Sequence, residues 1–130
     1  MPSVLHLSSR IPYPADDGGL IATWNLARCL AHNGYELDHY CFGASTMLEG
    51  ERRGTLEAVF RNLHVISKNV ERQYPLDLLR AIATRTAYFE CKYHTRQYWN
   101  AVADTLQKQV YDFTLIENAY VGVYLPLLEQ

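Results

Sequence analysis

The sequence predicts an α/β domain, a Rossmann-like parallel sheet of about four strands with helices on both faces. Short, continuously apolar runs recur along the chain, as is typical of strands buried on both faces. Between them, apolar residues follow the three- and four-residue steps of helices. The first strand, helix and strand take about forty residues, and a crossover of this kind requires the two strands to be parallel.

The first strand–helix–strand unit has clear boundaries. The apolar run Val4–Ser8 lies between prolines and is expected to be a buried strand. From Leu20 the apolar spacing predicts a helix, which Gly34 ends in the manner of a left-handed cap. Tyr35–Phe42 alternates well enough to be the second strand.

The rest of the chain repeats this pattern less cleanly. The expected segments are a loop at 43–54, a short helix at 56–63, a strand at 64–68, a helix that begins at Pro75, an irregular stretch at 84–95, a helix with a core stripe from Trp99 to Val110, a strand at 113–117 and a helix at 121–130. Doubly wound sheets usually have five or six strands, so four strands indicate an incomplete N-terminal domain. We expect residues 1–130 to form one domain.

Composition and charge exclude several classes of protein. The net charge of −2 and the scattered basic residues give no cationic surface of the kind that binds nucleic acid. No apolar run approaches the ~20 residues of a membrane-spanning helix, and the strand-like start is unlike a secretory signal. Cys29, Cys41 and Cys91 share no repeated spacing, which indicates reduced, mostly buried thiols in a cytoplasmic protein.

The stretch "SSRIPYPADDGGLIATWNLARCLA" is the most informative part of the chain. Its loop follows the first strand, where open parallel sheets bind ligands, and Gly18-Gly19 opens the helix. Free backbone N–H groups and the helix dipole favour a phosphate there. Neither the dinucleotide fingerprint nor the P-loop pattern is present. Asp16 and Asp17 would repel a phosphate unless they point elsewhere, and the alternative is that they cap the helix.

The order of these features resembles a known family. The segment "VLHLSSRIPYPADDGGLIATWNLARCLAHNGYEL" resembles the opening of family 4 glycosyltransferases, which have the two-domain GT-B architecture. The matching features are a D-x-G-G or G-G turn at Asp17-Gly18-Gly19, an N-L-x-x-x-L helix and a G-[YH]-E entry to the second strand. The resemblance is specific over residues 4–42 and looser to residue 125, through "YDFTLIENAYVGVYLP".

This resemblance implies an enzyme that transfers a sugar from a nucleotide-sugar donor, with retention of configuration and without a metal cofactor. It implies two Rossmann-like domains that face each other across a cleft. The N-terminal domain, here residues 1–130, holds the acceptor, and a C-terminal domain outside these residues binds the donor and supplies basic residues. Gly18 and Gly19 would contact the donor diphosphate, with Asp17 beside the substrate.

The resemblance also carries expectations for the protein as a whole. The enzyme would act in carbohydrate biosynthesis in the cytoplasm or at its membrane surface, on a small-molecule, glycan or lipid acceptor. The isolated domain is expected to self-associate through its uncovered sheet edge and cleft face. The alternative is a stand-alone Rossmann-like binding module without catalysis, and the gene sequence beyond Gln130 would distinguish the two.

Glu117 and Asn118 are the candidates at the carboxyl end of the fourth strand, which is expected beside the first. Glu117 could position an acceptor hydroxyl or act as a base, or it could cap the following helix. Asn118 is a candidate for substrate binding. Many relatives have a histidine near this place that contacts the transferred sugar, and this chain has none there.

Three further residues have two interpretations each. His6 lies within the first strand, where a hydrogen-bonded core histidine is favoured over a catalyst. Arg10 and Tyr13 belong to the loop that faces the cleft, so either side chain could bind acceptor or phosphate or be exposed to solvent.

Two other patterns are weak. Cys91 and His94 have C-x-x-H spacing, but no second pair completes a zinc site. Ser8 or Ser9 as a nucleophile lacks a histidine and an acid at any suggestive spacing, so neither is assigned this role.

Overall fold

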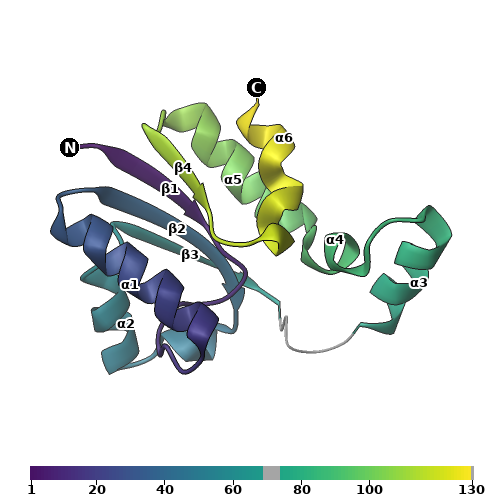
Figure 1. Ribbon diagram of the computed structural model, residues 1–130, viewed down its shortest axis with the longest axis horizontal. Coiled ribbons are helices and arrows are strands. Elements are labelled where there is room, and N and C mark those ends of the chain that lie inside the picture. The colour runs from purple at the N-terminus through teal and green to yellow at the C-terminus, as the bar shows by residue number, and fades with distance from the viewer. Residues whose placement is uncertain (69–73, 130) are drawn as a thin grey trace.

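The computed structural model describes residues 1–68 and 74–129, and it confirms an α/β fold with a Rossmann-like, all-parallel sheet (Figure 1). The strands are β1 (Ser3–Leu7), β2 (Glu36–Gly43), β3 (Asn62–Ser67) and β4 (Phe113–Ile116). The helices are α1 (Gly18–His32), α2 (Glu51–Glu57), α3 (Pro75–Thr84), α4 (Tyr88–Tyr93), α5 (Arg96–Lys108) and α6 (Leu125–Leu128), with 3-10 turns η1 (Ser45–Leu48) and η2 (Ala119–Tyr124).

The sheet order is β3-β2-β1-β4, so β1 lies between β2 and β4 as expected. After β1, the chain places β2 and then β3 on one side of β1, and it places β4 on the opposite side of β1. The boundary between β1 and β4 is therefore the point where strand order reverses, and the carboxyl ends of both strands open on the same edge. In register, His6 of β1 pairs with His39 of β2 and Leu115 of β4.

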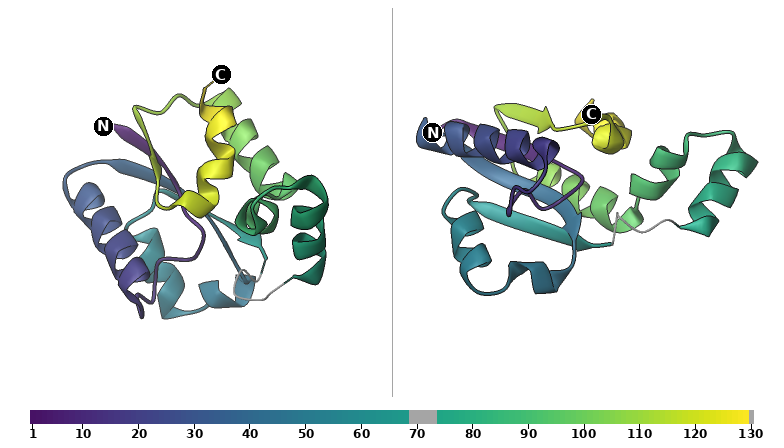
Figure 2. Two further views of the ribbon diagram at one scale, coloured as in Figure 1. Left: turned by 45° about the vertical axis from the view of Figure 1, so that its right-hand side comes forward. Right: turned by 60° about the horizontal axis from the view of Figure 1, so that its bottom comes forward.

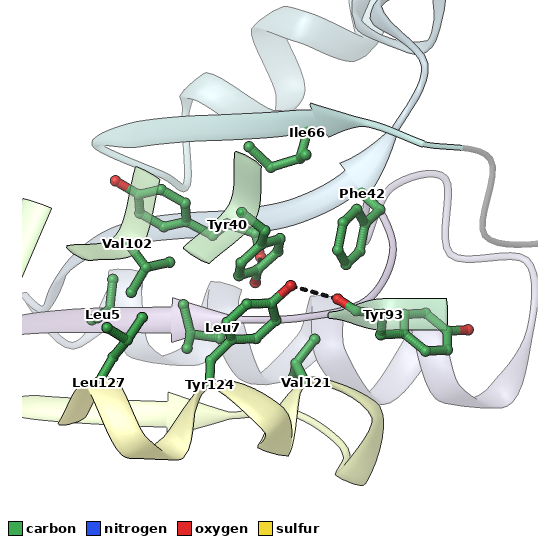
Figure 3. Packing of buried hydrophobic residues seen from close by; sticks show 11 residues of the cluster. Leu5, Leu7, Tyr40, Phe42, Ile66, Tyr93, Val102, Val121, Tyr124 and Leu127 are labelled. Carbon is green, nitrogen blue, oxygen red and sulfur yellow. Dashed lines mark hydrogen bonds between the residues drawn. The ribbon is translucent and has the colours of Figure 1, made fainter. Parts of the chain in front are cut away.

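Each face of the sheet has its own layer of helices (Figures 1 and 2). Leu5 and Leu7 of β1 face a core built with α5, η2 and α6. Figure 3 shows this core, including the Tyr124 hydroxyl that donates a hydrogen bond to the Tyr93 carbonyl. Val4 faces the opposite core, which contains Trp24 of α1. The prediction of helices on both faces is thus confirmed.

Tyr98 of α5 holds the carboxyl ends of β1 and β2 in place. Its fully buried hydroxyl donates to the carbonyl of Ser8 at 3.2 Å and to the carbonyl of Tyr40 at 2.9 Å. The Ser8 N–H also donates to the Tyr40 carbonyl, at 2.9 Å. Because a buried hydroxyl that loses its partners is costly, these bonds stabilise one backbone conformation at the start of the β1–α1 loop.

The helix expected at 56–63 is wrong in its bounds. α2 begins at Glu51, after Gly50 with its positive φ of 64°, and ends at Glu57. Phe60 lies in the connection between α2 and β3, and Leu63 lies in β3. The apolar residues of this segment pack into one core from a helix, a turn and a strand, which together imitate helical spacing.

The later segments also differ in detail. The stretch at 84–95 contains α4, whose six residues are too few for a periodic pattern. The helix whose core-facing residues were expected to run from Trp99 to Val110 is shorter, because α5 ends at Lys108 and Val110 is 90% exposed. The helix expected at 121–130 is η2 followed by α6, and Gln130 lies outside the described residues.

Two surface features complete the description. α3 lies far from the sheet, at the opposite end of the molecule from α1 (Figures 1 and 2), whereas α4 packs its Tyr93 into the core. Four large apolar side chains of α3 are exposed, namely those of Leu76, Leu78, Leu79 and Ile82. The expectation that the cysteine thiols are mostly buried is wrong, since only Cys41 is buried. Cys29 is exposed because it lies off the buried stripe of α1. Within the described ranges, no helix is both long enough and apolar enough to cross a membrane.

Candidate functional site

A pocket of about 210 Å³ lies where the carboxyl ends of β1 and β4 meet the first turns of α1. Its polar lining consists of Ser8, Ser9, Arg10, Thr23, Glu117 and Asn118, and Gly19 of α1 closes one side. The structure thereby brings together four of the residues singled out from the sequence, namely Arg10, Gly19, Glu117 and Asn118. This place at the reversal of strand order is where open α/β sheets bind ligands.

Asp17 caps α1 and pairs with Arg10. Its carboxylate accepts a hydrogen bond from the Leu20 N–H at 2.9 Å, and its other oxygen lies 2.7 Å from Arg10 Nη1. The Arg10 hydrogen bond, followed by that of Leu20, holds the pKa of Asp17 below its usual range. The capping interpretation of Asp17 is therefore confirmed. A carboxylate, rather than an open set of N–H groups, occupies the amino end of α1.

Gly18 and Tyr13 are not among the residues that line this pocket. Gly18 is the first residue of α1, and a Cβ there would meet nothing within 4 Å. Tyr13 packs its half-buried ring against Trp24, with 5.2 Å between ring centroids. The loop after β1 thus contributes Arg10 to the pocket, while Tyr13 contacts α1.

A second, larger pocket of about 320 Å³ adjoins the first beyond β2. The two share Arg10 and Leu20 in their linings. The charged residues around the larger pocket are Arg10, Asp16, Arg52 and Lys68, and apolar side chains such as Phe42 and Met47 form the rest. Arg10 therefore stands between two neighbouring hollows on the same edge of the sheet.

Glu117 follows β4 and is held from two sides. Its Oε2 lies 3.0 Å from His6 Nε2, and its Oε1 accepts a hydrogen bond from the Thr23 hydroxyl at 2.9 Å. The His6 hydrogen bond lowers the pKa of Glu117 and, with help from Thr23, outweighs the effect of burial. The carboxylate is thus ionised at neutral pH and faces the pocket with its side chain 14% exposed.

Asn118, not Glu117, caps the turn that follows β4. Its side-chain oxygen accepts a hydrogen bond from the Tyr120 N–H at 3.1 Å, and its amide donates to Ser9 Oγ at 3.0 Å. The alternative in which Glu117 caps this segment is therefore wrong. Asn118 also ties the β4 end to the loop after β1, since Ser9 belongs to that loop.

His6 is a fully buried, hydrogen-bonded core histidine, as favoured from the sequence. Its Nδ1 lies 3.0 Å from Nδ1 of His39, which is also fully buried. His39 Nε2 in turn lies 3.0 Å from Ser8 Oγ. Burial, followed by the proximity of His6, lowers the pKa of His39 far below its ordinary value, so that His39 is neutral.

Although no suggestive sequence spacing indicates it, the fold gives Ser8 a histidine partner and, through a second histidine, an acid. His39 is the histidine, and Glu117 is reached through His6. His39 and Thr23 are the functional candidates that the sequence analysis missed. A signal for His39 exists, because alignment of the two parallel strands VLHL and ELDHY places one histidine beside the other.

The C-x-x-H pair serves other contacts. Cys91 Sγ lies 3.3 Å from the Thr86 hydroxyl, and the His94 ring stacks on Tyr124 at 5.9 Å between centroids. Across residues 1–68 and 74–129, no group of three or more His, Cys, Asp and Glu side chains is arranged to hold a metal ion.

Comparison with known proteins adds no relative. The chain matches no protein-family model, no curated protein and no solved structure. Its function has to be argued from the chemistry of the pocket.

Proposed function

We propose that this chain is the acceptor-side domain of a glycosyltransferase that uses a nucleotide-sugar donor. One observation carries the proposal. A single pocket at the reversal of strand order combines an ionised carboxylate, Glu117, with a guanidinium, Arg10, and the first turn of a helix at Gly19. Sugar transfer requires both chemistries, since a hydroxyl must be oriented on one side and a departing diphosphate stabilised on the other.

The acceptor side of the pocket consists of Glu117 and Asn118. An ionised carboxylate accepts hydrogen bonds only, and each of its oxygens has more than one lone pair to offer. Glu117 therefore keeps capacity for an acceptor hydroxyl while it is held by His6 and Thr23. Because the carboxylate is largely buried, such a bond would be stronger than one made in water.

The donor side consists of Arg10 and the turn at Gly18 and Gly19. Arg10 can form a bidentate pair with a phosphate, but it now pairs with Asp17. A donor diphosphate would approach in competition with that carboxylate. The role of Asp17 in this proposal is to hold Arg10 at the helix until the donor arrives.

The size of the pocket supports a divided site. Drug-sized ligands occupy pockets of roughly 300–1,000 Å³, whereas this one measures about 210 Å³. It suits one sugar ring or one phosphate group rather than a whole nucleotide-sugar. In the proposal a further domain supplies the other wall, and the neighbouring pocket beyond β2 receives more of the acceptor.

We place this enzyme in the cytoplasm, on the membrane face where lipid or glycan acceptors are built. The spacing of Cys29, Cys41 and Cys91, which does not repeat, supports a reducing compartment. The net charge of −2 supports a small-molecule or glycan partner rather than a nucleic acid.

The test uses the protein encoded by the complete gene with a panel of nucleotide-sugars, and it measures nucleoside diphosphate release with and without sugar acceptors. We expect transfer from at least one donor. In Glu117→Gln, which keeps the shape and removes the charge, we expect kcat to fall by about tenfold or more while the donor KM stays within about twofold. Glu57→Gln, an exposed glutamate of α2, is the matched control and should behave as wild type.

Unchanged turnover in Glu117→Gln would overturn the role of Glu117. Absence of transfer from every donor, together with binding of a nucleotide or sugar, would favour the stand-alone binding module.

A further inference from the structure

The side chains Ser8, His39, His6, Glu117 and Thr23 form one continuous chain of hydrogen bonds. Every link measures 2.9 or 3.0 Å. At one end the Ser8 hydroxyl donates to the Arg10 carbonyl at 2.9 Å, and at the other end the Thr23 hydroxyl reaches the Gly19 carbonyl at 3.0 Å. Ser8, Glu117 and Thr23 line the same pocket, so both ends of the chain reach the site of proposed chemistry.

Each link needs one hydrogen atom, and this requirement determines where protons lie. The Arg10 carbonyl can only accept a hydrogen bond, so the Ser8 hydroxyl uses its one hydrogen to donate to it. The hydrogen between Ser8 and His39 must then be bound to His39 Nε2. A neutral His39 then has a bare Nδ1, so His6 donates to it from Nδ1. The link from His6 Nε2 to the Glu117 carboxylate needs a further proton. In this first arrangement His6 is an imidazolium.

A second arrangement contains one proton fewer. The Ser8 hydroxyl turns from the Arg10 carbonyl to His39 Nε2, and His39 donates from Nδ1 to a bare His6 Nδ1. His6 is then neutral and still donates from Nε2 to Glu117. The heavy atoms need not move between the two arrangements. The exchanged proton enters and leaves at Ser8, because among the three members that line the pocket it is the one whose own hydrogen changes partner.

We propose that these side chains form a proton relay in which Ser8 takes the proton of the acceptor hydroxyl and His6, beside Glu117, holds the resulting charge. The inference rests on the proposed function. It deepens that function by assigning the proton's entry point to Ser8 and by giving Glu117, besides its contact with the acceptor hydroxyl, a positioning role that acts through His6.

The step balances as follows. The acceptor oxygen bonds to the anomeric carbon, and the bond from that carbon to the donor phosphate oxygen breaks, with its electron pair leaving on the diphosphate. The acceptor proton passes to Ser8 Oγ while the Ser8 hydrogen passes to His39 Nε2. The hydrogen on His39 Nδ1 moves to His6 Nδ1, and the positive charge ends next to the Glu117 carboxylate. Loss of one proton from Ser8 to water restores the starting arrangement.

The surroundings of the relay favour a charge on His6 over a charge on His39. Glu117 is the ionised group that faces His6, from the end of β4. His39 has a neutral hydroxyl on its other side and the Phe60 ring stacked on it, with centroids 4.4 Å apart. At the rim of the pocket, Arg10 and Asp17 form an ion pair with each other. An imidazolium is therefore stabilised at His6 and not at His39.

The first test requires no enzymatic activity. Nitrogen-15 NMR of the imidazole rings of this chain, recorded across a pH series, distinguishes the Nδ1–H and Nε2–H tautomers. We expect His39 to stay neutral and to change from the Nε2–H to the Nδ1–H tautomer as the relay passes from the first arrangement to the second with rising pH. In Ser8→Ala the proton has no entry through the hydroxyl, so we expect the coupled change of His39 to disappear. A single His39 tautomer over the whole series in the wild type would overturn the relay.

The second test uses the full-length enzyme and the variants Ser8→Ala, Glu117→Gln and their combination. A relay acts as one unit, so each single variant should lower kcat by about tenfold or more and the double variant should be no worse. Donor KM should stay within about twofold, and Ser67→Ala, an exposed serine of β3, should match wild type. Full turnover in Ser8→Ala would overturn the relay but leave the proposed function standing. A tautomer switch in a protein that transfers no sugar would support the relay and overturn the proposed function.

Discussion

Arg10 and Asp17 form the ion pair that closes the amino end of α1, with Arg10 Nη1 2.7 Å from Asp17 Oδ2. The carboxylate also accepts the Leu20 N–H, so one side chain meets both the helix dipole and the guanidinium. An anionic ligand at this turn would have to share or displace these bonds. Helix capping and anion binding therefore compete for the same groups.

Asp17→Asn tests this competition. The amide oxygen can still cap Leu20, while the loss of charge removes the competition of the Asp17 carboxylate with an anionic ligand for Arg10. We expect the affinity of the chain for a nucleoside diphosphate, measured by calorimetry, to rise by about threefold or more. Asp104→Asn, which makes the same charge change on α5, should leave the affinity unchanged. Equal affinity in Asp17→Asn and wild type would show that the phosphate does not approach Arg10.

The two glycines of the turn should respond differently to a branched side chain. A Cβ at Gly19 would lie 3.3 Å from Asp17 Oδ1 and 3.7 Å from Arg10 Nη2, whereas Gly18 has open space. We expect Gly19→Val to lower donor kcat/KM in the full-length enzyme by about tenfold, or ~1.4 kcal/mol. Gly18→Val should have little effect. Because neither glycine has a positive φ, the melting temperature of each variant should change by only a few degrees.

These two variants also separate the interpretations of the turn. If Gly19→Val retains wild-type activity, the turn does not face the donor. If both variants unfold the chain, the glycines are required for the backbone conformation of the turn and not for binding of the donor.

Asp38 should contribute strongly to stability. It is 2% exposed, and Arg61 donates to both of its oxygens from Nε and Nη2, at 2.9 and 2.6 Å. Burial alone would raise the pKa of Asp38, but hydrogen bonds led by those of Arg61 and Tyr111 lower it below the ordinary value of 3.8. A depressed folded-state pKa stabilises the fold above the unfolded-state pKa, and this stabilisation is lost as the pH falls through the folded-state value.

Asp38→Asn is therefore expected to lower the free energy of unfolding by about 2 kcal/mol at neutral pH. Between pH 5 and pH 2 the variant should lose less stability than wild type, because its side chain cannot take up a proton. Urea unfolding at several pH values measures both effects. Glu57→Gln, which breaks the exposed pair with Arg53, is the control and should hardly change stability. Parallel pH profiles in Asp38→Asn and wild type would contradict the expectation.

The central strands β1 and β2 could be predicted from the sequence because they are buried along almost their whole length and therefore need continuous apolar runs, whereas the edge strands β3 and β4 are only partly buried. The helix that starts at Pro75 was equally clear, since proline is favoured at the first helical position. The short elements were not predictable. α4 has six residues, and its buried positions include Lys92, which no apolar pattern would select.

About half of the pocket could be predicted for one physical reason. Parallel strands end at the same edge, so residues just after β1 and β4, such as Arg10 and Glu117, were expected to meet. His39 lies inside β2, and its contact with His6 depends on the register between two strands. The register of these parallel strands is determined by their packing together with the α1 crossover, and a single strand does not reveal it. Thr23 was missed because its contact with Glu117 joins residues 94 positions apart.

The apolar face of α3 should make this chain associate with copies of itself. Leu76, Leu79 and Ile82 are 77%, 62% and 68% exposed on a helix that extends away from the sheet (Figures 1 and 2). At the sheet edge, Phe113 of β4 is 58% exposed. Clustered apolar surface promotes association, because each aliphatic side chain that becomes buried contributes roughly 1.5–3 kcal/mol, and an open strand edge can pair with another strand.

We expect light scattering on this chain at about 100 µM, well above the micromolar range typical of weak association, to give a mass above that of the monomer. The variant Leu76→Gln/Leu79→Gln/Ile82→Gln should lower that mass toward the monomer value. Its unfolding should be nearly unchanged, because glutamine favours helices and these side chains are exposed in the monomer. The control Ile21→Gln/Leu26→Gln/Leu125→Gln removes the same number of exposed apolar side chains from α1 and α6. If the control lowers the mass and the α3 variant does not, the chain associates through another surface. If the wild-type chain is a monomer, the α3 face does not cause association.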